Sequence, residues 1–116
     1  MKNISGFTTE IINDVFIVTI NFNRATFKNA EIMDKLLSNE IATGRSKLLI
    51  EMHNVEFVDS TFIGALVINL KKLVLLNGKL ILVGLKPSVC SIILQTNLKR
   101  TFEIFTSREE ALKNIE

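Results

Sequence analysis

Apolar and polar residues follow two different periods along this chain. In residues 15–22, apolar residues recur at every second position, the period of a β-strand, and residues 7–12 form a second β-like run. Asn13 and Asp14 lie between the two runs and suit a tight turn, so a β-hairpin is predicted. Further short apolar runs predict strands at residues 47–52, 79–83 and 101–105.

Between these strands, apolar residues recur three and four positions apart, which is the spacing of one helix face. Four helices are predicted, beginning near Asn29, at about Thr61, at Pro87 and after Ser107. Asn29 and Ser107 are good N-caps, and Pro87 is tolerated in a first helical turn. Gly44 suits the C-terminal end of the first helix.

The longest helix is expected at about residues 61–76, where Asn77 and Gly78 end it. Its predicted core face consists of Ile63, Leu66, Val67, Leu70 and Val74. Asn69 and two lysines interrupt this apolar window, and it falls short of the ~20 predominantly apolar residues that span a bilayer. We therefore expect a buried helix and no membrane insertion.

A hairpin followed by alternating helices and strands predicts an α/β fold. Strands that are separated by helices pair in parallel through right-handed crossovers. The expectation is one domain over residues 1–116, with a mixed sheet of about five strands and about four helices. At 47% apolar and 22% charged residues, the composition is that of an ordinary globular protein.

The chain has one cysteine, Cys90, and one histidine, His53. A single cysteine cannot form an internal disulfide, and this pair alone makes a structural zinc site implausible. No signal-peptide pattern precedes residue 7. These features predict a cytoplasmic protein that needs no metal or cofactor.

The net charge is only +2, but the charges are unevenly distributed. Residues 60–102 contain no acidic residue, and their basic residues are Lys71, Lys72, Lys79, Lys86, Lys99 and Arg100. These residues either are simply solvated or form a basic face for an acidic partner, an anionic membrane surface or nucleic acid. They are spread out, with no arginine-rich run and no interleaved aromatic residues, so nucleic acid is not expected.

The segment 58–66 places an acid and two hydroxyls at the start of the longest predicted helix. One interpretation is structural, because Asp59 or Ser60 would cap the free N–H groups of the first helical turn. The other is functional, because the free N–H groups and partial positive charge at the N-terminus of a helix favour an added negative charge there.

This segment resembles the phosphorylation motif of STAS domains, the family named for sulfate transporters and anti-sigma factor antagonists. The motif is an Asp-Ser-(Ser/Thr)-Gly-Leu-Gly-like run at a junction of strand, loop and helix, and its matching residues here are Asp59, Ser60, Thr61, Ile63 and Gly64. The resemblance covers nearly the whole chain. It implies a cytoplasmic anti-sigma factor antagonist that changes partners when a kinase phosphorylates Ser60, with Thr61 as a second candidate.

The resemblance further implies that an anti-sigma factor or Ser/Thr protein kinase binds at residues 59–62 and 64. Phe62 departs from the motif, which has glycine there, so its ring is either part of the core or an aromatic anchor for the partner. Thr26 occupies the position at which many phosphorylated members carry an aspartate, although a shift of the loop would place Asn23 there instead.

Two other classes of function compete with this one. The first is a STAS scaffold subunit of a signalling or lipid-transport complex that docks without phosphorylation. The second is an enzyme, which is not expected, because the sequence shows no acid–base pair, metal cluster or nucleophile triad. The sequence leaves open whether the chain is a monomer or a homodimer.

Overall fold

A six-stranded sheet runs through the middle of the molecule, in the order β1-β2-β3-β5-β7-β8. The computed structural model describes residues 1–96 and 102–115. The strands of this sheet are β1 (Lys2–Ile4), β2 (Phe7–Ile12), β3 (Val15–Ile20), β5 (Lys47–Glu51), β7 (Lys79–Val83) and β8 (Glu103–Phe105). Pairing is antiparallel from β1 to β3 and parallel from β3 to β8. The mixed α/β sheet is therefore confirmed.

The strand count is higher than the five expected. A sixth strand, β1, lies at the sheet edge beside β2, and a separate parallel pair joins β4 (Arg24–Ala25) to β6 (Phe57–Val58). The strands β1, β4 and β6 have only two or three residues each and show no hydrophobic period of their own, so the apolar pattern does not predict them. The hairpin is confirmed, with both turn residues, Asn13 and Asp14, at positive φ. Of the strand expected at residues 101–105, residue 101 lies outside the described residues.

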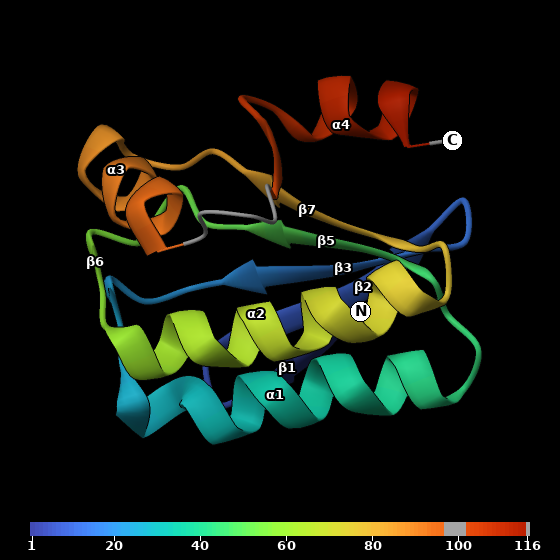
Figure 1. The fold of residues 1–116 in the computed structure, drawn as a ribbon, viewed down its shortest axis with the longest axis horizontal. Coiled ribbons are helices and arrows are strands. Elements are labelled where there is room, and N and C mark those ends of the chain that lie inside the picture. Colours follow the sequence, from blue (N-terminus) through green and yellow to red (C-terminus); the bar gives the residue numbers. More distant parts are fainter. Residues whose placement is uncertain (97–101, 116) are drawn as a thin grey trace.

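The described residues form four helices around the sheet: α1 (Phe27–Ala42), α2 (Ser60–Leu75), α3 (Pro87–Thr96) and α4 (Arg108–Asn114). As Figure 1 shows, α1 and α2 lie side by side over one face of the sheet, and α4 lies over the other. The third helix lies at the end of the sheet where β6 is found. The central strands are thus covered on both faces, which explains their continuous apolar sequences.

The first helix begins three residues earlier than expected. Thr26, not Asn29, is the N-cap of α1, and its hydroxyl accepts a hydrogen bond from the amide of Lys28. Asn29 occupies the third helical position, where its side chain accepts a bond from the amide of Thr26 at 3.0 Å. The C-cap is Thr43, and Gly44 follows it at a φ of +103°. Asn29 therefore completes a reciprocal capping box.

The core face of α2 differs from the expected one at its C-terminal end. Ile63, Leu66 and Leu70 are buried as expected, but Val74 is 44% exposed and Leu73 is fully buried in its place. Val67 is only half-buried. The buried positions also include Phe62 and Asn69, so the stripe is rotated from the predicted one. This rotation comes from the contact with α1, which the sequence pattern of α2 alone does not reveal.

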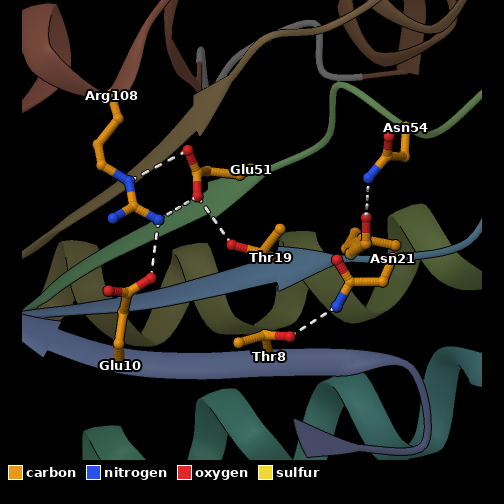
Figure 2. A network of polar contacts seen from close by, with 8 residues as sticks. Thr8, Glu10, Thr19, Asn21, Glu51, Asn54 and Arg108 are labelled. Carbon is orange, nitrogen blue, oxygen red and sulfur yellow. Dashed lines mark hydrogen bonds and ion pairs between the residues drawn. The ribbon is translucent and has the colours of Figure 1, made fainter. Parts of the chain in front are cut away.

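On the opposite face of the sheet, a polar network holds α4 in place (Figure 2). Arg108, the first residue of α4, donates hydrogen bonds to Glu51 and to Glu10, the latter at 2.8 Å. Thr19 also donates to Glu51, at 2.7 Å. Burial by itself raises the pKa of the Glu51 carboxyl, but the bonds from Arg108 and Thr19 and the charge of Arg108 outweigh burial, so that this pKa lies below its ordinary value.

Candidate functional site

The pairing of β4 with β6 brings two distant helix starts together. In this pair, Ala25 lies opposite Val58, and each strand is followed by one capping residue and then a helix. The capping residues are Thr26 for α1 and Asp59 for α2. The amide of Asp59 donates a hydrogen bond to the carbonyl of Ala25 at 3.2 Å. Both helices therefore begin at the same corner of the molecule, where their N-terminal partial positive charges add.

Asp59 uses both carboxylate oxygens at this corner. Its Oδ1 accepts a hydrogen bond from the amide of Phe62 in α2, at 2.8 Å. Its Oδ2 accepts one from the amide of Phe27 in α1, also at 2.8 Å. The structural interpretation of Asp59 as an N-cap is confirmed, and the same side chain additionally joins α2 to α1.

The two candidate hydroxyls lie on the surface in the first turn of α2. Ser60 and Thr61 are both exposed, and neither hydroxyl has a hydrogen-bond partner among the described residues. The amides of Phe62 and Ile63 bond to Asp59, whereas those of Ser60 and Thr61 have no partner in the described part of the chain. The first turn of α2 therefore presents two hydroxyls and two backbone amides that have no hydrogen-bond partner among the described residues.

Gly64 follows one turn after Ser60. A Cβ atom built on Gly64 would meet nothing within 4 Å, so no neighbour in the fold requires a glycine there. Glycine inside a helix destabilises it by roughly 1 kcal/mol relative to alanine. Gly64 therefore leaves the surface of α2 low and open directly beside Ser60, at some cost to the stability of the helix.

Phe62 belongs to the core, which corrects its assignment to the partner-binding surface. Its side chain is 0% exposed. The exposed ring at this corner is instead Phe27, in the first turn of α1, at 65% exposure. Phe57 of β6 is partly exposed as well, and the guanidinium of Arg24 lies 4.5 Å from the centre of its ring. The rings exposed to solvent at this corner are thus those of Phe27 and Phe57, not that of Phe62.

Sequence reasoning missed Phe27 because it placed this residue in a polar loop. The only available signal was a large apolar residue outside the stripe of the following helix. Its position beside Ser60 depends on the bond to Asp59, 32 residues away, which no local pattern reveals. Next to Phe27, a hollow of about 340 Å³ is lined by Arg24, Thr26, Phe27, Lys28 and Asn29.

The lone histidine and cysteine lie away from this corner. His53 is exposed in the loop after β5, where its carbonyl accepts a hydrogen bond from Lys86. Cys90 is half-buried in α3. Within residues 1–96 and 102–115, no three histidine, cysteine or acidic side chains are grouped as metal ligands would be. The helices in the same part of the chain are all too short or too polar to cross a bilayer.

Comparison with known families agrees with this geometry. The family model described as the STAS domain matches residues 7–111. The chain belongs to the STAS domain family. The match includes the β4–β6 pair, both helix starts and the whole of α2.

Three similar proteins indicate which kind of STAS protein this chain resembles. A protein of Thermotoga neapolitana, named as a candidate anti-sigma factor antagonist, is 30% identical over 95% of this chain and 97% of its own. The crystal structure of a Thermotoga maritima protein described in the same way has a TM-score of 0.86, with 28% identity over 94% of this chain and 93% of the other. The phosphorylated form of Bacillus SpoIIAA has a TM-score of 0.77 at 18% identity, covering 95% and 99%, and shares the fold. The STAS domain therefore resembles proteins named as candidate anti-sigma factor antagonists over nearly its whole length.

Proposed function

We propose that this STAS domain is a cytoplasmic anti-sigma factor antagonist whose partner is released when a Ser/Thr protein kinase phosphorylates Ser60. The observation that carries the proposal is the exposed, unbonded hydroxyl of Ser60 at the start of α2, beside the open surface at Gly64. A protein docked over Gly64 would cover Ser60. The domain would act by binding and not by catalysis.

The local electrostatics suit a phosphate on Ser60. A phosphoryl group adds about −1.5 to −2 units of charge and three strong acceptor oxygens. The amides of Ser60 and Thr61 are available as donors, and two helix N-termini meet at Asp59. The fold would thus tolerate the phosphate, while a partner packed against this corner would meet new charge and bulk.

The relatives support the same proposal. The Thermotoga proteins are named as candidate anti-sigma factor antagonists, and SpoIIAA is an anti-sigma factor antagonist with a solved phosphorylated form. Thr26 departs from the acid that many phosphorylated members carry at this position, and here it serves as the N-cap of α1.

Phosphorylation is tested by intact-mass measurement after incubation with Mg-ATP and the anti-sigma factor kinase encoded nearest to this chain in its genome. Wild type should gain the mass of one phosphoryl group, Ser60→Ala should gain none, and Thr61→Val should behave as wild type. Modification of Ser60→Ala but not of Thr61→Val would transfer the acceptor role to Thr61. An unmodified wild type would contradict the switch.

Release of the partner is tested by binding of the same anti-sigma factor to Ser60→Asp. We expect its affinity to fall by about 2 kcal/mol or more, because an unpaired charge enters the contact. Ser60→Ala should bind as wild type does. Equal affinity for wild type and Ser60→Asp would instead favour a scaffold subunit that docks without phosphorylation.

A further inference from the structure

The outward face of α2 forms one continuous surface from Ser60 to the end of the helix. At about 100° per residue, Ser60, Gly64, Ile68, Lys71 and Leu75 lie within about 80° of one another, and opposite the buried stripe. We call these five residues the outer strip. At ~1.5 Å per residue, the strip is about 22 Å long, whereas the site proposed above occupies only its first turn.

The outer strip carries two large apolar residues, Ile68 and Leu75, at positions where a water-facing helix is usually polar. Leu75 is 85% exposed and Ile68 is 53% exposed. A single exposed apolar residue is ordinary, but these two are seven residues apart on one face, which is the repeat of a helix-packing seam. Gly64 continues the same face, and the absence of its side chain lets a second helix approach closely.

The charge of this surface is positive. Lys71 lies in the strip and Lys72 beside it, both exposed, and neither forms an ion pair with any described residue. The acidic side chains on neighbouring α1 already have partners. Glu31 pairs with Lys35 at 3.0 Å, and Asp34 accepts a hydrogen bond from Asn69 at 2.8 Å. The two lysines therefore provide unpaired positive charge along the apolar strip.

We propose that the outer strip binds an acidic amphipathic helix of the partner protein. This helix would place an apolar stripe on Ile68 and Leu75, carboxylates near Lys71 and Lys72, and its closest backbone approach at Gly64. Charge complementarity favours an acidic helix over a basic one, and the length of the strip matches about four helical turns. The proposal rests on the function proposed above and extends its contact from Ser60 to the far end of α2.

The test uses the full chain and two synthetic helical peptides that share one leucine stripe. In one peptide the flanking positions are glutamate, and in the other they are lysine. Amide shifts in two-dimensional NMR titrations should map the glutamate peptide to the outer strip, with affinity at least ~10-fold higher than that of the lysine peptide. Equal affinity for the two peptides, or shifts centred on another surface, would overturn the proposal.

Variants test whether the peptide binds specifically to the outer strip or nonspecifically to exposed residues elsewhere. Leu75→Ser and Lys71→Glu should each weaken binding of the glutamate peptide by about 10-fold. Their matched controls are Leu94→Ser on α3, where the leucine is 49% exposed, and Lys113→Glu on α4. The controls should bind as wild type does. A loss in the controls equal to that in the strip variants would count against the proposal.

Two further measurements test whether the outer strip binds a membrane or a second copy of this chain instead of a partner helix. The first measures binding of the protein to vesicles of anionic lipid. If the vesicles bind more tightly than the glutamate peptide, and if Leu75→Ser loses this binding, the outer strip is a membrane-binding surface instead. Self-association of the free protein that Leu75→Ser abolishes would assign it to a second copy. If the glutamate peptide binds but the kinase does not modify Ser60, only the proposed switch is refuted. If the kinase modifies Ser60 but the glutamate peptide does not bind, only the proposal for the outer strip is refuted.

Discussion

The Oδ2 atom of Asp59 accepts a hydrogen bond from the amide of Phe27 at 2.8 Å, although the two residues are 32 positions apart. The other oxygen of this carboxylate caps α2. One side chain therefore fixes the start of α1 relative to the start of α2, and with it the exposed Phe27 ring relative to Ser60. A STAS domain that switches partners at Ser60 would need this geometry to persist when the partner leaves.

Replacement of Asp59 tests the double cap. Asp59→Ala removes an acceptor from two helix N-termini, and loss of a single N-cap costs about 1 kcal/mol. We therefore expect a loss of about 2 kcal/mol in the free energy of unfolding, measured with urea. Ser107→Ala, which removes the single bond to Glu110 at the head of α4, is the matched control and should cost about half as much. Equal losses would mean that the bond to Phe27 contributes nothing.

Gly64→Ala should separate stability from binding. The new methyl group meets no neighbour and improves the helix, so we expect a gain of up to about 1 kcal/mol in unfolding free energy. Affinity for the anti-sigma factor should fall in the same variant, because the methyl group keeps the partner away. At Gly78 an added Cβ would lie 2.4 Å from the carbonyl oxygen of Ser46, so Gly78→Ala should destabilise the protein. Unchanged partner affinity in Gly64→Ala would remove Gly64 from the docking surface.

Replacing Phe62 and replacing Phe27 should have opposite effects on stability and on partner binding. Phe62→Leu leaves a void in the core and should cost about 1–2 kcal/mol of unfolding free energy, with partner affinity little changed. Phe27→Leu should leave stability within about 0.5 kcal/mol of wild type, because the ring is exposed, and should speed partner dissociation. Urea unfolding and dissociation rates on both variants decide the matter. A faster off-rate for Phe62→Leu alone would restore Phe62 as the anchor.

The network around Glu51 should make stability depend on pH. Its pKa in the folded protein lies below the ordinary value of 4.5, so its contribution is present above that pH and is lost as pH falls through the lowered pKa. Glu51→Gln should cost about 2 kcal/mol at about pH 7, where the charged hydrogen bonds are intact, and this cost should shrink as pH falls through the lowered pKa. Urea unfolding at a series of pH values below about 7 measures the change. Glu109→Gln, at an exposed position of α4, is the control, and a loss for Glu51→Gln that is the same at every pH would contradict this role.

The sequence by itself determined the order of the major elements and the position of the motif. Period-two spacing identified the hairpin, continuous apolar runs identified the central strands, and helical spacing identified α2, because the burial of each element is written in its own residues. The run Asp59-Ser60-Thr61 placed two hydroxyls at a helix start, and capping preferences are local enough to be visible there. Both the STAS resemblance and the mixed sheet followed from these signals.

Only the tertiary structure decided which side chains are exposed at the corner where α1 and α2 begin. Phe62 is buried and Phe27 exposed because α1 and α2 start at one corner and pack side by side, a relationship set by the β4–β6 pair and by Asp59. The same holds for Arg108, whose bonds reach Glu10 and Glu51 across 98 and 57 residues. Such contacts depend on strand order and helix packing. They leave no periodic trace in the sequence, because each residue satisfies a neighbour that is distant along the chain.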